Sequence, residues 1–271
     1  MEDFARLREQ LSNPCKQSWE VLLTLLDAWP QESVELAIEY CLEHLADWPQ
    51  EFRKYPENIE LKEILDEKAS WVLHRLATQL DLWSKSIGTE EAITIANSPT
   101  LSKLTNLNLR WNSIGTEGVF AIVNSPTLSN LTHLNLDENS IEDAGAIAIA
   151  NSPTRLSKLT FLDLHQNSIG DDGAIAIANS PTLSNLLELR LGYNSIRDEG
   201  AIAIANSPTL SNLTHLSLGG NSIKDAGALS IANSQTLKNL TYLYIHENQI
   251  GKEGRKALVH WAKTHQCYLD L

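Results

Sequence analysis

A single motif fills most of the chain, as in Leu131-Thr-His-Leu134-Asn-Leu136-Asp-Glu-Asn139-Ser-Ile, followed by Asp143-Ala-Gly-Ala-Ile-Ala-Ile-Ala-Asn-Ser-Pro153-Thr. It recurs with little change from about residue 77 to the C-terminus. A degenerate first copy has Ala77 and Lys85 where Leu and Asn are expected. A repeat of 27 or 28 residues indicates stacked supersecondary units. Its asparagine recurs at Asn112, Asn139, Asn167, Asn194, Asn221 and Asn248.

Each repeat changes its hydrophobic period halfway, and this change predicts the local structure. Leu134-Asn-Leu136 alternates as a short strand does, with the leucines facing inward. Ala and Ile then follow at helical spacing, and Asn-Ser-Pro-Thr ends the helix because proline disfavours a helical residue before it. Stacked units of this kind share one continuous core. The residue expected to cap each helix is Thr or Asp: Thr116, Asp143, Asp171, Asp198 and Asp225.

The sequence resembles the leucine-rich repeat family, and its strand-plus-helix unit resembles the ribonuclease-inhibitor-like subclass. The match is carried by Leu104-x-x-Leu107-x-Leu109-x-x-Asn112-x-Ile114 and its five later copies, over roughly 70% of the chain. The resemblance implies an α/β horseshoe solenoid with parallel strands on the concave face and helices on the convex face. It also implies that each repeat asparagine hydrogen-bonds backbone groups of adjacent turns, and that the concave face recognises proteins.

Residues 1–76 lack this period and predict an all-α N-terminal domain, separate from the repeat domain at 77–271. Asn13-Pro14 is a plausible start for a helix that places Trp19, Leu22, Leu26 and Trp29 on one face. Further helices are expected from Val34 to Leu45 and from Ile59 to Leu76. The unit is interpreted as a cap on the first repeat, with a docking or effector module as the alternative. Residues 254–264 predict a longer C-terminal helix.

The variable positions of the strands point away from the core and form the candidate partner-binding surface. Aromatic residues and arginine often anchor protein interfaces, and their exposure does not help folding. Free drift at unconstrained positions is the alternative, but it does not account for the aromatic enrichment. The candidates are Trp83, Arg110, Trp111, Asp137, Glu138, Phe161, His165, Arg190, Tyr193, Tyr242 and Tyr244.

Several classes of site and partner are not expected. A net charge of -13 disfavours nucleic acid, and no apolar run is long enough for a membrane span. The three cysteines have neither metal-ligand nor disulfide spacing, so no metal site is predicted from them. The sequence has no P-loop and no dinucleotide fingerprint, and no cofactor or catalytic site is predicted. Asp137 and His165 occupy adjacent repeats and are expected to make a surface ion-pair contact, because no third ligand converges on them. Asp163 and Arg190 are expected to pair with each other.

The sequence therefore predicts a non-catalytic protein–protein recognition module, acting as an inhibitor, adaptor or sensor. The acidic N-terminus is unlike a signal peptide, so a cytoplasmic location is expected, and a monomer is favoured. One alternative is a GTPase-activating or other enzyme-regulating repeat protein. The other is a structural or self-assembling array, because the helices are so uniform.

Overall fold

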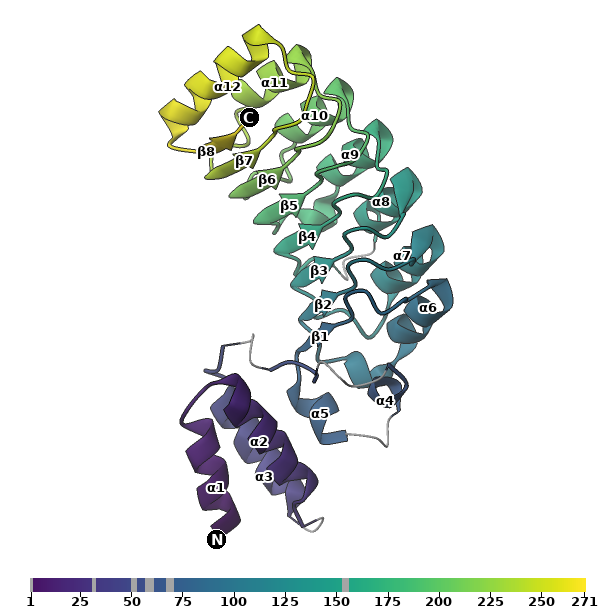
Figure 1. The fold of residues 1–271 in the computed structure, drawn as a ribbon, viewed down its shortest axis with the longest axis vertical. Helices are drawn as coiled ribbons and strands as arrows, with labels where there is room; N and C mark the ends of the chain where they lie inside the picture. The colour runs from purple at the N-terminus through teal and green to yellow at the C-terminus, as the bar shows by residue number, and fades with distance from the viewer. Residues whose placement is uncertain (1, 31–32, 50–52, 57–60, 67–70, 153–155) are drawn as a thin grey trace. The chain divides into compact units, whose positions relative to one another are not determined.

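The computed structural model describes residues 2–30, 33–49, 53–56, 61–66, 71–152 and 156–271 (Figure 1). The chain divides into two compact units. The first comprises Met1–Asp81 with Ser98–Asn106, and the second comprises Leu82–Asn97 with Leu107–Leu271. Among the described residues, no helix has the length and apolarity needed to cross a bilayer.

The first unit is mainly helical, as predicted. Trp19, Leu22, Leu26 and Trp29 are all buried. The first helix after Pro14 is capped by Cys15, whose sulfur accepts a hydrogen bond from the Ser18 amide. The elements are α1 (Glu2–Leu11), α2 (Lys16–Asp27), α3 (Val34–Leu45), α4 (Leu61–Leu65), α5 (Trp71–Leu76), β1 (Gln79–Asp81) and the 3-10 helix η2 (Pro99–Leu101).

The predicted helical run from Ile59 to Leu76 corresponds to α4 and α5, and its residues 59–60 and 67–70 lie outside the described residues. The segment Ser98–Asn106, although it follows the first helix of the repeats, packs within the first unit. The Thr100 hydroxyl donates to the Ile64 carbonyl at 3.0 Å, and the Thr105 amide donates to the Thr78 carbonyl at 2.8 Å. The helical unit therefore needs residues well beyond 76 to complete its hydrogen bonds.

Strands and helices alternate along the rest of the chain, which is the predicted α/β solenoid. The eight strands form one parallel sheet in the order β1 to β8. The elements are α6 (Thr89–Asn97), β2 (Asn106–Asn108), α7 (Gly115–Asn124), β3 (His133–Asn135), α8 (Glu142–Ala150), β4 (Phe161–Asp163), α9 (Asp171–Ala178), the 3-10 helix η3 (Pro181–Leu183), β5 (Glu188–Arg190), α10 (Asp198–Ala205), β6 (His215–Ser217), α11 (Asp225–Ala232), β7 (Tyr242–Tyr244), α12 (Lys252–His265) and β8 (Tyr268–Asp270).

The core of the second unit lies between its strands and helices. The central leucine of each strand pairs with its counterpart in the next, as Leu162 does with Leu189, and both are fully buried. Strand alternation sends the flanking residues to the opposite side of the sheet. We call this side the strand face. It comprises the first and third residues of β2–β8 and the two residues that follow the third leucine of each repeat.

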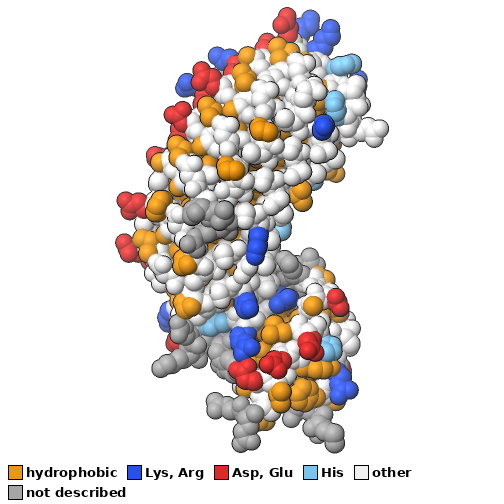
Figure 2. All heavy atoms as spheres, turned by 180° about the vertical axis from the view of Figure 1, so that it is seen from behind, with side chains coloured by type: hydrophobic (Ala, Val, Ile, Leu, Met, Phe, Trp, Pro, Cys, Tyr) orange, Lys and Arg blue, Asp and Glu red, His pale blue; other side chains and the backbone are white. Residues whose placement is uncertain are grey.

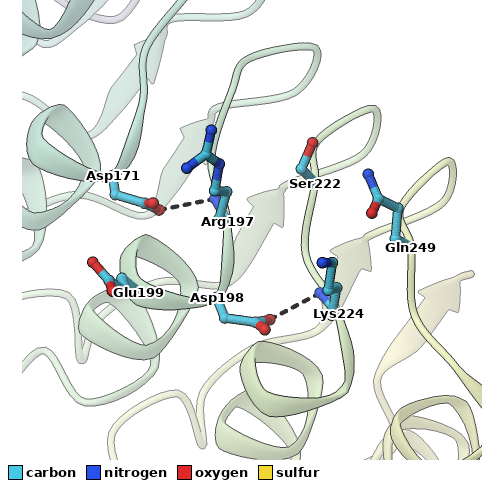
Figure 3. Close-up of a pocket in the computed structure, with 7 residues that line it drawn as sticks. All are labelled: Asp171, Arg197, Asp198, Glu199, Ser222, Lys224 and Gln249. Carbon is cyan, nitrogen blue, oxygen red and sulfur yellow. Dashed lines mark hydrogen bonds between the residues drawn. The ribbon is translucent and has the colours of Figure 1, made fainter.

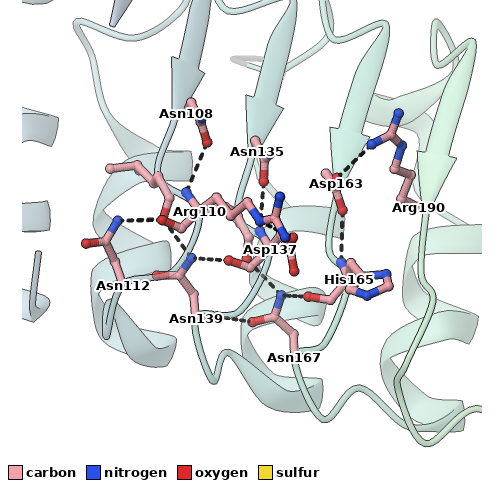
Figure 4. Close-up of polar contacts among 12 residues, drawn as sticks. Asn108, Arg110, Asn112, Asn135, Asp137, Asn139, Asp163, His165, Asn167 and Arg190 are labelled. Carbon is pink, nitrogen blue, oxygen red and sulfur yellow. Dashed lines mark hydrogen bonds and ion pairs between the residues drawn. The ribbon is translucent and has the colours of Figure 1, made fainter. Parts of the chain in front are cut away.

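The repeat asparagines hydrogen-bond across neighbouring repeats, and Figure 4 shows this contact between Asn139 and Asn167. The Asn167 side-chain amide donates to the carbonyls of Leu136 at 2.8 Å and His165 at 2.9 Å. Its oxygen accepts from the amides of Asn139 at 2.9 Å and Ile141 at 3.3 Å. Because these groups are buried, the asparagine satisfies backbone atoms that water does not reach.

The prediction that Thr116, Asp143, Asp171, Asp198 and Asp225 cap their own helices is wrong. None makes a capping hydrogen bond to its own helix, because each lies within the first helical turn. The aspartates cap the next repeat instead. The Asp171 carboxylate accepts from the amide of Arg197 at 2.8 Å (Figure 3) and from the amide of Gly200 at 2.9 Å. Thr116 instead donates to the Ile141 carbonyl at 3.0 Å.

Several helices carry more than one acid in their first turn, and Figure 2 shows acidic side chains spaced along the helix edge of the second unit. Negative charge is favourable at a helix N-terminus because the amides there are unpaired. The hollow in Figure 3 is lined by Asp171, Asp198, Glu199, Arg197 and Lys224, with Ser222 and Gln249. Since its two aspartates are occupied by capping, we interpret this hollow as structural.

Candidate recognition surface

The strand face carries two rows of side chains that the parallel register sets side by side. One row runs through Phe161, Glu188, His215, Tyr242 and Tyr268. The other runs through Asp163, Arg190, Ser217, Tyr244 and Asp270. Neighbouring strands lie about 4.8 Å apart, so consecutive residues of a row can touch one another.

The predicted aromatic candidates lie at this surface to different extents. Trp111 is 46% exposed and Tyr193 is 43% exposed, while Trp83 and Tyr242 are also exposed. Phe161 and Tyr244 are half-buried. Trp83 and Trp111 are close, with ring centroids 6.1 Å apart. Exposed aromatic rings are therefore present at both ends of the strand face in the second unit.

Two buried aspartates hold the arginines of the strand face. Asp137, expected as an exposed contact, is only 4% exposed, and its Oδ2 lies 2.7 Å from Arg110 Nε rather than pairing with His165. Asp163 is 3% exposed and pairs with Arg190 at 3.4 Å, as predicted, while Arg190 also contacts Glu188 at 2.6 Å (Figure 4). The long arginine side chains cover the carboxylates and exclude solvent from them.

Burial changes the acidity of both aspartates. It raises the pKa of Asp137, and the nearby Asp163 charge raises it further against the opposing effect of Arg110. Burial also raises the pKa of Asp163, although the His165 amide donates to this carboxylate and Arg190 pairs with it. The Oδ1 of Asp137 has no hydrogen-bond partner among the described residues. These carboxylates are therefore costly to bury, and their pairing offsets only part of the desolvation.

The residue before each repeat asparagine has a left-handed backbone. The φ angle is 56° at Trp111 and 51° at Tyr193, whereas the equivalent Gly220 has 67°. A bulky residue in this region is strained, by about 1 kcal/mol or more, because its Cβ crowds the backbone. Two large exposed rings therefore occupy positions where glycine is energetically preferred.

Glycines provide space beneath some of these rings. A Cβ at Gly220 would lie 2.8 Å from the Tyr193 ring, and a Cβ at Gly192 would lie 2.8 Å from His165 Nδ1. The rings of His165 and Tyr193 are 5.0 Å apart. The Tyr193 hydroxyl donates to Glu247 Oε2 at 2.7 Å, and this hydrogen bond raises the pKa of Tyr193. The backbone and a carboxylate together fix the orientation of the Tyr193 ring.

The sequence interpretation missed several rings of the strand face. His215 stacks on Tyr242 with centroids 4.4 Å apart, and Tyr268 is 5.8 Å from Tyr242 and 55% exposed. The restarted strand pattern Cys267-Tyr-Leu269-Asp-Leu271 already placed Tyr268 in register with Tyr242. His133 stacks on Phe161 at 5.6 Å, and burial lowers the pKa of His133.

An open hollow of about 420 Å³ lies on β5–β7, lined by His165, Glu188, Arg190, His215, Ser217 and Tyr244, with Leu189 and Leu216. The three cysteines are free thiols. In the part of the chain that the structure describes, no three His, Cys, Asp or Glu side chains are grouped as metal ligands. The contacts described on the strand face are ion pairs and stacked rings.

Comparisons with known proteins agree with the repeat architecture. Residues 100–123, 127–150, 155–178 and 182–205 match the leucine-rich repeat model, and residues 211–253 match a model of two such repeats. The chain belongs to the leucine-rich repeat proteins. No curated protein matches it.

Three similar solved structures have TM-scores below 0.5. An internalin C2 from Listeria monocytogenes str. 4b F2365 is 26% identical, with 69% of this chain and 70% of that chain covered and a TM-score of 0.47. An internalin (InlF) from the same strain is 20% identical, with coverages of 71% and 54% and a TM-score of 0.45. Leiomodin-1 actin-binding site 2 is 19% identical, with coverages of 55% and 88% and a TM-score of 0.41.

Proposed function

We propose that this chain is a non-catalytic protein-recognition module that binds a protein partner on its strand face, the concave face of the predicted solenoid. The observation that carries the proposal is the exposure of Trp111 and Tyr193 in a left-handed backbone. Exposing rings of this size does not stabilise the fold, and aromatic residues often anchor protein interfaces. The left-handed backbone itself is shared by the equivalent Glu138, Gln166 and Glu247, so the argument depends on the exposed rings. The repeat length also supports the ribonuclease-inhibitor-like subclass.

The shape and chemistry of the surface support a protein as the ligand. Seven strands at about 4.8 Å span roughly 30 Å, which suits a domain or a helix better than a small molecule. Aromatic and arginine side chains are those that most often anchor protein interfaces. The buried aspartates are engaged by arginines, an arrangement that holds side chains in place and offers no nucleophile with an adjacent base.

Affinity capture from native lysate tests the proposal. The immobilised full chain should retain a partner, and the double variant Trp111→Ala, Tyr193→Ala should lose it while keeping its stability within about 1 kcal/mol. Phe120→Ala is the matched control, because Phe120 on α7 is 60% exposed and lies away from the strand face. Equal loss of the partner in the control, or unchanged capture by the double variant, would contradict a strand-face site.

A further inference from the structure

We propose that copies of this chain associate head to tail, with the basic stripe of α12 (Lys252, Lys256, Val259 and Lys263) in one copy lying across α9 and α10 of the next. Such a contact joins two different surfaces, so each pair of copies leaves one of each surface open. It goes beyond the proposed recognition function, because it uses the helices rather than the strand face. It also departs from the monomer that the sequence favours.

The helices of the array differ sharply in charge. No Lys or Arg lies in α6, α7, α8, α9, α10 or α11, all of which the structure describes in full, and each carries at least one acid in its first turn. In α12, by contrast, Lys252, Arg255, Lys256 and Lys263 outnumber the single acid Glu253. The last helix therefore carries charge opposite to that of the helices before it, and surfaces of opposite charge attract one another.

The basic stripe occupies one side of α12. Its residues are four, three and four positions apart, a spacing that places them in line on a helix. All of them are exposed, and Val259 is 41% exposed. Within the described part of the chain, the three lysine side chains make no hydrogen bond or ion pair. The stripe thus combines three unpaired cations with one exposed apolar side chain.

The complementary surface lies on α9 and α10, which pack against each other. Asp172 and Glu199 hold the equivalent position, directly before the glycine of each helix, and both are exposed. Neither side chain makes a hydrogen bond or an ion pair with another described residue. One turn further along each helix lie Ile175 and Ile202, which are half-buried. We call these four residues the acceptor surface.

No other neighbouring pair among α6–α11 offers the same combination. The equivalent position is Ala144 in α8 and Ala226 in α11, so both of these helices lack the acid. In α6 it is Glu91, whose carboxylate accepts a hydrogen bond from the Gly88 amide at 2.9 Å. Glu117 in α7 therefore has no free acid at this position on either neighbouring helix. Among these helices, α9 and α10 alone place two free carboxylates side by side.

The spacing of the two surfaces also agrees. Lys256 and Lys263 are seven residues apart. At about 1.5 Å per residue, their separation along α12 is roughly 10 Å. Packed helices lie about 8–10 Å apart, so Asp172 and Glu199 have a similar separation. When α12 lies across α9 and α10, it can therefore set one lysine against each carboxylate, with Val259 between them on the two isoleucines.

These charges cannot meet within one chain. α12 packs against α11, so α10 lies two helix spacings away, roughly 16–20 Å, beyond the reach of a lysine side chain. The net charge of -13 opposes association by long-range repulsion, but at physiological salt charges more than about 8 Å apart are largely screened. The local attraction then decides, and a contact of two ion pairs and one apolar side chain is weak and salt-sensitive.

Sedimentation velocity on the full chain tests this inference. Over about 10 µM to about 0.5 mM, a range suited to weak contacts, the weight-average sedimentation coefficient should rise with concentration at about 0.1 M salt and rise much less at about 0.5 M. The rise should continue beyond the value of a dimer, because each added copy leaves both kinds of surface open. A coefficient that does not rise at the lower salt concentration would overturn the inference.

Two double variants remove one surface each. Lys256→Gln with Lys263→Gln neutralises the basic stripe, and Asp172→Asn with Glu199→Gln neutralises the acceptor surface. All four side chains are exposed, so the fold should be kept. Each double variant should weaken association by about three- to tenfold, because two ion pairs are lost.

Matched controls change the charge equally at other exposed positions. Lys103→Gln with Lys238→Gln lies in turns, and Glu117→Gln with Glu142→Gln lies on α7 and α8. Each control should weaken association by less than about 1.5-fold. Equal effects of the double variants and their controls would count against the two surfaces named.

A mixture of the two double variants tests the head-to-tail geometry. The first retains the acceptor surface and the second retains the basic stripe, so together they should form one-to-one dimers and nothing larger. A symmetric contact would not be restored by mixing. A mixture that associates no more than its separate components, or that forms species larger than dimers, would overturn the inference.

Discussion

Asn167→Ala should destabilise the chain far more than the same substitution at Asn179 in the same repeat. Asn167 is fully buried and makes four hydrogen bonds to backbone groups, whereas Asn179 is exposed and its side chain makes one, to the Ile175 carbonyl. The alanine leaves the amides of Asn139 and Ile141 buried without an acceptor. At about 1–3 kcal/mol for each stranded group, with partial relaxation, the loss should be roughly 2–4 kcal/mol.

Equilibrium urea denaturation followed by far-ultraviolet circular dichroism measures the difference. Asn179→Ala should stay within about 1 kcal/mol of the unmodified chain, as should Lys85→Ala, where the first repeat lacks the asparagine. Native-state hydrogen exchange adds a local readout, because the amides of Asn139 and Ile141 should exchange faster in Asn167→Ala alone. Indistinguishable midpoints for Asn167→Ala and Asn179→Ala would refute the claim that this asparagine holds neighbouring repeats together.

Four further outcomes are expected. Asp171→Ala should lower the free energy of unfolding by about 1–2 kcal/mol and should speed amide exchange at the start of α10 more than at the start of α9. Faster exchange at the start of α9 than at the start of α10 would count against capping between repeats. Trp111→Gly should be about 1 kcal/mol more stable than Trp111→Ala in thermal denaturation, because glycine relieves the left-handed backbone; equal stabilities would exclude strain there. Because burial raises the pKa of Asp137 above its ordinary 3.8, the folded chain binds this proton more tightly than the unfolded chain, and stability from this group falls as pH rises through the raised pKa. Asp137→Asn should therefore gain stability relative to the unmodified chain between about pH 4 and pH 7, and a constant difference would contradict the shift. Finally, a 1–76 fragment should lack cooperative unfolding by tryptophan fluorescence, whereas a 1–106 fragment that retains η2 should show more structure; a cooperative 1–76 fragment would support the independent-module alternative.

The period of the sequence was sufficient to predict the strands, the helices and their stacking. Leucines two residues apart must face the same side of a strand, so Leu134 and Leu136 identify the buried side without further information. The role of Asn167 was available only through the family resemblance, and the structure shows the individual hydrogen bonds.

Contacts between repeats were harder to predict. Asp171 lies at the start of a helix, and the sequence of one repeat does not show which helix its carboxylate reaches. Asp137 was expected to be exposed because strand-face positions usually are, but Arg110 from the preceding repeat covers it. The left-handed backbone at Trp111 was not predicted either. Glycine is the residue type typical of that conformation, and among the equivalent residues only Gly220 is a glycine. These features depend on the distance between neighbouring repeats, which a linear pattern does not contain.

Capping between repeats affects how the array can be lengthened or recombined. Asp171 serves the repeat that follows it, whereas Asn167 serves the repeat that precedes it, so a single repeat excised at its strand carries unsatisfied groups on both sides. A transplanted segment must therefore bring an aspartate for the helix after it and an asparagine for the turn before it. The starts of α7 and α8 face Thr89 and Thr116 instead of an aspartate, so an exchanged block would lose less at these two junctions.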